Sequence, residues 1–201
     1  MRLAGPRGAG TVGRMGSAPA VSRRNAWGSL AVLAAVVVIA FGLPLIDRAL
    51  PSSRAVAAGR AYDVGANVTV VPPGGASVDV TGTRPGADRG TALFLVGGVR
   101  LVVVVSPYTG TLNAAATRLG ARITHSTGFQ VAGPGQQVRS TQGVAGLRGG
   151  YSSPGRLGQY AVFVAGNRAV ELTASGPESE LRSESTALTA SVQSVQFGAA
   201  R

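Results

Sequence analysis

The sequence contains no cysteine and no lysine, and aromatic residues make up only 5% of it. The absence of cysteine excludes disulfides, a thiolate nucleophile and a sulfur-ligated metal. The absence of lysine excludes a nucleoside-phosphate loop of the usual kind, because the lysine that completes that motif is missing. The few aromatic residues offer little stacking surface, so we expect no nucleic-acid partner.

Acidic residues are also few, eight against nineteen arginines. They are scattered without the spacing that a metal site needs, so we expect no metal and no cofactor. Three of them, Glu178, Glu180 and Glu184, stand together where acids favour the N-terminus of a helix. That position is enough to explain their grouping.

The single histidine, His125, is the one candidate for a catalytic base. It could activate Ser106 or Ser126, with Asp79 or Asp88 orienting the ring. The sequence has no G-x-S-x-G motif, and a histidine near a helix end more often interacts with the terminal carbonyls. We therefore expect no catalysis. An envelope hydrolase that uses a serine and His125 is the alternative.

Residues 27–46 carry no ionisable side chain. A helix over this segment, at ~1.5 Å per residue, spans ~30 Å, the thickness of a bilayer's hydrocarbon core. The arginines that precede it, with no acid among them, are Arg2, Arg7, Arg14, Arg23 and Arg24. Because short cytoplasmic flanks carry the arginine excess, the N-terminus is expected inside and the C-terminus outside. We predict a basic cytoplasmic leader over 1–26 and a single-pass signal anchor in the cell membrane over 27–46.

The small-x-small sequence Ala55-Val56-Ala57 is of the kind that signal peptidase accepts. A removable signal, however, normally has roughly 7 to 15 apolar residues with the cleavage site close behind, and here the site lies far downstream. We favour a retained anchor, and cleavage near Ala57 stays open as the alternative. Residues 47–66 contain proline, serine and glycine without a regular apolar period, which predicts a tether between membrane and domain.

Residues 67–198 are predicted to form an extracytoplasmic α+β domain. The strongest local signal is a hairpin, with strands at 91–96 and 99–105 joined by Gly97-Gly98, because both glycines tolerate the positive φ of a tight turn. A second hairpin is predicted through Gly166-Asn167. Shorter strands or turns are expected at 68–70, 78–80, 129–131, 133–135, 137–139 and 144–151.

Two helices are predicted. The first covers 111–125, where apolar residues recur at helical spacing and Arg118 and Arg122 share another face. The apolar positions of this stripe are Leu112, Ala116, Leu119 and Ile123. The second follows Ser175, which stands three residues before Glu178 in a capping pattern. The order strands, helix, strands, helix favours an antiparallel sheet covered by two helices.

Two stretches carry a resemblance to known proteins: TRPGADRGTALFLVGGVRLVVVVSPYTGTLNAAATRLGARIT, residues 83–124, and YSSPGRLGQYAVFVAGNRAVELTASG, residues 151–176. The chain resembles a family of small single-pass membrane proteins of actinobacteria. The element order is similar to the PsbP-like α/β/α sandwich, which also occurs in actinobacterial envelope lipoproteins of the LpqN type. That resemblance implies a binding or adaptor module. The lipobox cysteine of those lipoproteins is missing here, so anchoring would fall to the helix.

The domain contains arginines without evident matching acids. Arg84 and Arg89 flank a proline-glycine loop, while Arg118 and Arg122 share a helix face. Guanidinium groups bind phosphates and carboxylates in pairs, so we expect these four residues to bind an anionic partner, either an envelope protein or an anionic envelope component. The alternative for any single arginine is a solvated surface charge.

The membrane topology can be tested directly. An alkaline phosphatase fused after Arg201 should be active, since that enzyme requires an oxidising compartment, and the intact chain should stay with membranes washed in carbonate. A fusion that is produced but inactive, or a chain released by carbonate, would contradict the topology. The mass of the mature protein distinguishes a retained anchor from cleavage near Ala57.

Overall fold

The computed structural model describes residues 52–126 and 128–198. The predicted leader and membrane anchor lie outside these residues, as does the start of the predicted tether, 47–51. Within the described residues, no helix has both the length and the apolar character needed to cross a membrane.

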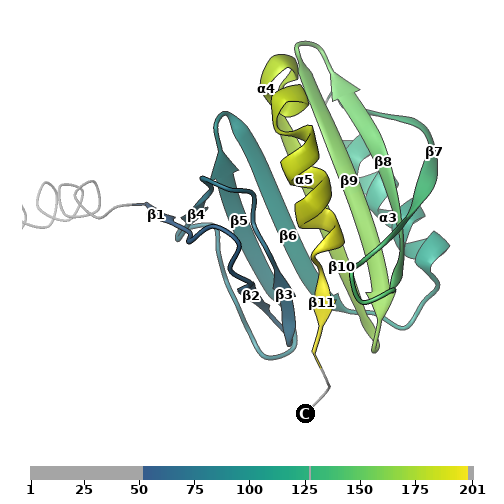
Figure 1. Ribbon diagram of the computed structural model, residues 1–201. Helices are drawn as coiled ribbons and strands as arrows, with labels where there is room; N and C mark the ends of the chain where they lie inside the picture. Colours follow the sequence, from purple (N-terminus) through teal and green to yellow (C-terminus); the bar gives the residue numbers. More distant parts are fainter. Residues whose placement is uncertain (1–51, 127, 199–201) are drawn as a thin grey trace, which may run out of the picture. The chain divides into compact units, whose positions relative to one another are not determined.

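The domain is built on an antiparallel sheet of eight strands in the order β1-β4-β5-β6-β10-β9-β8-β7 (Figure 1). In that order the strands are β1 (Ser53–Ala55), β4 (Ser77–Asp79), β5 (Gly90–Val96), β6 (Val99–Pro107), β10 (Arg168–Pro177), β9 (Arg156–Ala165), β8 (Ala145–Ser153) and β7 (Gln130–Arg139). A second antiparallel sheet, in the order β11-β3-β2, consists of β11 (Gln196–Phe197), β3 (Val68–Val70) and β2 (Tyr62–Gly65).

Both predicted hairpins are confirmed. Val96 pairs with Val99 across Gly97-Gly98, and Gly97 has a φ of +53°. Arg168 pairs with Ala165 across the second turn, where Gly166 and Asn167 have φ values of +55° and +59°. Two successive positive φ angles are the geometry that joins twisted antiparallel strands through two residues.

Helices cover both faces of the large sheet (Figure 1). On one face, α3 (Leu112–His125) packs on β7, β8 and β9. On the other face lie α4 (Glu178–Ser183) and α5 (Ser185–Gln193), which meet at Glu184, together with the small sheet. The predicted antiparallel sheet with helices on it is therefore confirmed, with the C-terminal helix divided in two.

Two apolar clusters hold these layers together. The larger one joins the big sheet to α4, α5 and the small sheet and includes the fully buried rings of Phe94 and Phe163. The smaller one lies under α3, where Ala115, Leu119 and Ile123 pack among side chains of β8 and β9. Each fully buried aromatic or leucine side chain contributes about 1.5–3 kcal/mol to folding.

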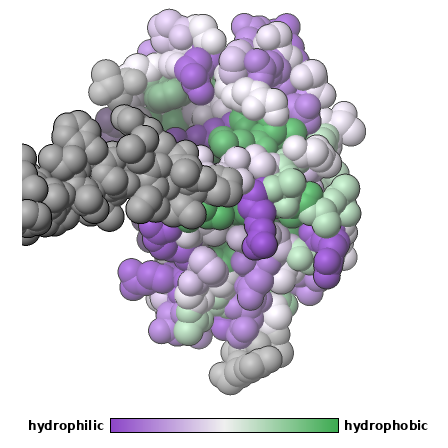
Figure 2. Space-filling view, turned by 90° about the vertical axis from the view of Figure 1, so that its left-hand side faces the viewer, coloured by the Kyte–Doolittle hydropathy of each residue, from purple (hydrophilic) through white to green (hydrophobic). Residues whose placement is uncertain are grey.

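The face at the β1 edge is mostly polar, with apolar residues gathered in smaller patches (Figure 2). Within the described part of the chain, Val80 is the large hydrophobic residue that is exposed, at 46%. Single apolar residues on a surface are normal in soluble domains.

The domain begins earlier than the sequence predicted. Within the predicted tether, Ser53–Ala55 forms β1, which pairs with β4, and Tyr62–Gly65 forms β2, which pairs with β3. Val64 is fully buried, and the Tyr62 ring packs edge-on against Phe94 at a centroid distance of 5.1 Å. Strands of three or four residues contain too few alternations to be recognised by period, so the sequence pattern missed them.

Two further predictions need correction. Ser175 is not a helix cap, because it lies within β10 and pairs with Arg100 and Gly158. The turn predicted at 133–135 is instead a bulge inside β7, whose register with β8 shifts between Ala132 and Gln136.

Glycine is required where the two sheets approach each other. A Cβ on Gly90 of β5 would overlap the Val64 carbonyl oxygen of β2. Because backbone would have to move, we expect Gly90→Ala to lower the free energy of unfolding by about 3 kcal/mol. Pulse proteolysis of the full chain in increasing urea measures this change.

Gly120→Ala is the matched control. Gly120 lies in α3, and the nearest atom to an added Cβ is Cγ2 of Val131 at 3.9 Å. This variant should gain about 0.5–1 kcal/mol, because alanine is the better helix former. Equal stabilities for the two variants would contradict the close approach of the sheets.

Candidate functional site

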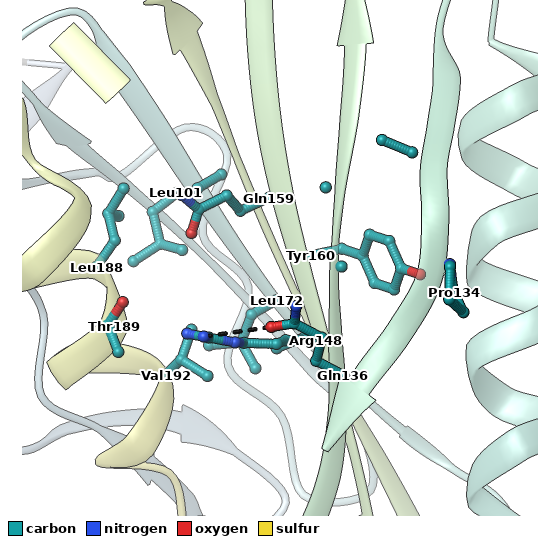
Figure 3. Close-up of a pocket in the computed structure, with 15 residues that line it drawn as sticks. Leu101, Pro134, Gln136, Arg148, Gln159, Tyr160, Leu172, Leu188, Thr189 and Val192 are labelled. Carbon is teal, nitrogen blue, oxygen red and sulfur yellow. Dashed lines mark hydrogen bonds between the residues drawn. The ribbon is translucent and has the colours of Figure 1, made fainter. Parts of the chain in front are cut away.

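A pocket of about 310 Å³ opens between α5 and the face of β7–β10 that α5 covers (Figure 3). This volume lies at the lower end of the roughly 300–1,000 Å³ usual for small-molecule sites. Its lining residues are Leu101, Ala132, Pro134, Gln136, Arg148, Gly149, Gly150, Gln159, Tyr160, Ala161, Leu172, Ala174, Leu188, Thr189 and Val192.

The bulge in β7 opens one side of the pocket. Ala132 pairs with Gly150 and Gln136 with Arg148, so residues 133–135 lie opposite Gly149 alone. A Cβ at Gly149 would lie 2.5 Å from atoms of the Tyr160 ring. Only glycine therefore leaves room for the ring beside the bulge.

The floor and roof of the pocket are apolar. Leu101 of β6 and Leu172 of β10 are each 1% exposed, and Leu188 of α5 is 2% exposed. Ala161 and Ala174 lie between larger side chains on the same sheet face. These small residues leave a gap over which an apolar ligand could lie.

The polar groups gather at the β7–β8 side and along α5. Arg148 reaches from β8 toward Thr189 and Val192 (Figure 3), and its Nη2 donates to Gln136 Oε1 over 3.5 Å. At that length the hydrogen bond is weak. The Thr189 hydroxyl donates to the Ser185 carbonyl at 2.8 Å, which leaves its lone pairs able to accept.

The described lining residues contain groups that can hold a ligand. Among the described residues that line the pocket there is no histidine, aspartate, glutamate or serine. The polar groups that are present are the guanidinium of Arg148, the amides of Gln136 and Gln159, and the hydroxyls of Tyr160 and Thr189, all of which can form hydrogen bonds with a ligand. The arrangement therefore supports binding.

Sequence patterns did not reveal this pocket. Its residues come from five strands and one helix, and no local motif connects them. Arg148 is not among the four arginines that the sequence predicted to bind an anion.

The sequence suggested that Arg118 and Arg122 lack a matching acid. The structure corrects this. Their Nη2 atoms donate to the two carboxylate oxygens of Glu171, with 3.1 Å between Arg118 Nη2 and Glu171 Oε1. The Glu171 side chain on β10 is 5% exposed, whereas those of the arginines are 46% and 54% exposed. The Arg118 guanidinium also lies over the Tyr108 ring, 4.7 Å from its centroid.

The other two predicted arginines lie apart from this pair. Arg84 donates to the carbonyls of Val80 and Thr83 at 3.2 and 2.8 Å, and Arg89 is exposed. Arg84 pairs with Thr91. Thr91 of β5 pairs with Val104 of β6, and Val104 pairs with Glu171 of β10. At ~4.8 Å per strand, Arg84 lies ~14 Å from Glu171. The structure therefore brings together Arg118 and Arg122 but not all four arginines. Anion binding by these four residues stays a prediction.

The groups of the alternative catalytic site are dispersed. His125 is exposed at the end of α3, and the Ser126 hydroxyl donates to the Arg122 carbonyl. Asp79 accepts hydrogen bonds from the Thr81 hydroxyl and from the backbone at Thr81 and Gly82; these bonds, the hydroxyl's first, lower the pKa of the Asp79 carboxyl. Since α3 packs on β7–β9, β4 is at least four strands away, or ~19 Å.

A tyrosine connects the small cluster under α3 to the pocket. The Tyr151 hydroxyl donates to the carbonyl of Ala174, a pocket residue, at 3.1 Å. Burial raises the pKa of Tyr151, so this hydroxyl keeps its proton and stays a donor through the neutral range.

No known protein family matches the chain, and no curated protein matches it. Solved structures with some similarity include cyanobacterial PsbP from Synechocystis sp. PCC 6803, at 15% identity and a TM-score of 0.49, covering 74% of this chain and 94% of that one. The Ran-binding protein Mog1p of Saccharomyces cerevisiae has 11% identity and a TM-score of 0.43, covering 69% and 95%. A Mog1 mutant gives the same identity and TM-score. TM-scores below 0.5 do not establish a shared fold, so the PsbP-like assignment stays a prediction.

The ion pairs at Glu171 give a testable account of how α3 is held. Replacing both Arg118 and Arg122 by alanine leaves a buried, unpaired carboxylate, and we expect a loss of about 3 kcal/mol in the free energy of unfolding. Adding Glu171→Gln to that variant should recover part of the loss, because the buried charge is then gone. Urea unfolding followed by pulse proteolysis measures both.

Arg182→Ala is the control for this experiment. Arg182 pairs with Glu178 on α4, and both side chains are exposed. Its loss should change stability by no more than about 0.5 kcal/mol. The account is wrong if the double variant is as stable as this control.

Proposed function

We propose that this protein is a membrane-anchored, extracytoplasmic binding module of the cell envelope that carries out no catalysis. The uncharged segment 27–46 holds the domain at the membrane, and the pocket between α5 and β7–β10 receives the ligand. The membrane and an envelope component are its partners.

The composition of the pocket lining carries this proposal. Its floor and roof are leucines, and its described lining residues also supply a guanidinium, two side-chain amides and two hydroxyls but no histidine or carboxylate. Sites with a mainly apolar wall and a few placed polar groups are the usual form of ligand pockets. A hydrolase would need His125, which lies at the end of α3 on the opposite face of the sheet from α5.

A pocket-filling variant tests the proposal. Thr189 is half-buried and lines the pocket, so Thr189→Trp should fill part of it. Full chain isolated from its native membranes is denatured, and the released small molecules are identified by mass spectrometry. A compound released by the wild type should fall about tenfold or more in Thr189→Trp, because displacing ligand contacts worth ~1.4 kcal/mol already costs that factor.

Two controls complete this experiment. Ala190→Trp places the same side chain on the neighbouring exposed position of α5 and should keep the compound. His125→Ala should keep it unaltered. A wild type that releases nothing would contradict the binding module. Conversion of the compound by the wild type but not by His125→Ala would establish the hydrolase.

A further inference from the structure

We propose that the pocket binds an amphiphile with one anionic head group, a carboxylate or a phosphate, whose head is held by Arg148 and whose hydrocarbon part lies beneath α5. This inference rests on the proposed function, since it names the ligand class of the same pocket. It follows from how charge and apolar surface are distributed across the strands.

Arg148 is the one charged residue among the described residues that line the pocket. The ion pairs of the described chain involve other arginines, at Arg118, Arg122 and Arg182. The polar partner of Arg148 is neutral and distant, the Gln136 amide oxygen at 3.5 Å. Its guanidinium therefore offers a nearly complete set of donors in a fork that fits a carboxylate or a phosphate.

Strand register sets the direction of the ligand. Arg148 of β8 pairs with Ala161 of β9, and Ala161 pairs with Leu172 of β10. Directly paired residues share a sheet face, so a polar, a small and an apolar side chain follow one another across three strands. At ~4.8 Å per strand, Leu172 lies ~10 Å from Arg148.

A second row repeats this gradient. Gly150 pairs with Gln159, Gln159 with Ala174, and Ala174 with Leu101. Gln159 projects toward α5, where Leu188 and Thr189 face it (Figure 3). The amide therefore lies at the middle of the pocket, and the sheet becomes more apolar toward β6.

These two rows favour a molecule that lies across the strands, with its head at the β7–β8 side and its tail toward β6 and α5. Burial of a tail on Leu101, Leu172 and Leu188 supplies affinity in proportion to the apolar area covered. A neutral head group would gain no charge-assisted contact with Arg148, whose exposed side chain water otherwise solvates, and a cationic head group would be repelled. The head group thus determines selectivity, and the tail supplies much of the affinity.

Photolabelling of the full chain in phosphatidylcholine nanodiscs tests this inference. The probes are diazirine analogues of decanoate, decyl phosphate and decanol, and mass spectrometry locates the labelled peptides. Decanoate or decyl phosphate should label the peptides of β8, β9 and α5, and decanol should label them about tenfold less, as expected for the loss of one charge-assisted contact. Inorganic phosphate in excess should compete poorly, because it lacks a tail.

Arg148→Gln should lower labelling by decanoate and decyl phosphate about tenfold, whereas Arg148→Lys should keep part of it, because a charge remains without the fork. Arg139→Gln is the matched control. Arg139 lies on β7 outside the pocket lining, where its Nη1 donates to the Gly143 carbonyl at 3.2 Å, and its replacement should leave labelling unchanged.

The outcomes separate this inference from the proposed function. Equal labelling by decanol, or full labelling of Arg148→Gln, overturns the anionic head group while the pocket still binds. Absence of label in the pocket peptides overturns the amphiphile, and the compound lost in Thr189→Trp then identifies another ligand class. Competition by inorganic phosphate as strong as by decyl phosphate assigns the site to a free anion and overturns the role of the tail.

Discussion

The arrangement of this domain depends on one buried carboxylate, that of Glu171. It lies in the middle of β10 with both oxygens engaged by the guanidinium groups of α3. A buried charge is tolerated only when it is paired and hydrogen-bonded, so the Glu171 side chain requires α3 to lie where Arg118 and Arg122 can reach it. This one requirement fixes the helix over β7–β9 more specifically than apolar contact, which has no direction, could do alone.

The position of α3 then shapes the opposite face of the sheet. Leu119 and Ile123 cover the tyrosines of β8 and β9, and the Tyr160 ring takes the space beside Gly149 where β7 bulges away. The other tyrosine, Tyr151, bonds to the backbone of β10 at a residue of the pocket floor. Contacts made under α3 thus position Tyr160 and the backbone of Ala174, which both line the pocket on the α5 side.

The sequence predicted the helices and turns whose conformation depends on neighbouring residues in the chain. Gly97-Gly98 and Gly166-Asn167 form hairpins because positive φ is a property of those residues, and the apolar period of 112–123 predicts α3 because it recurs at helical spacing. Long-range features were missed. Glu171 lies 53 residues from Arg118, so no helix or strand period relates them. One signal was available: an acid between Val170 and Leu172 in an apolar strand must find a buried partner.

The same reasoning changes which arginine matters for recognition. Counting basic residues favoured Arg118 and Arg122, because two guanidinium groups on one helix face look like a site for an anion. Their donors, however, are already directed at Glu171, and an incoming anion would compete with a buried carboxylate that has no other described ion-pair partner. Arg148 has a neutral partner at the limit of hydrogen-bond length and lines the same pocket as three buried leucines. For anion recognition the deciding feature is a guanidinium that has no carboxylate partner and lies in a pocket with apolar walls. Arg148 has this feature, whereas the charges of Arg118 and Arg122 are directed at Glu171.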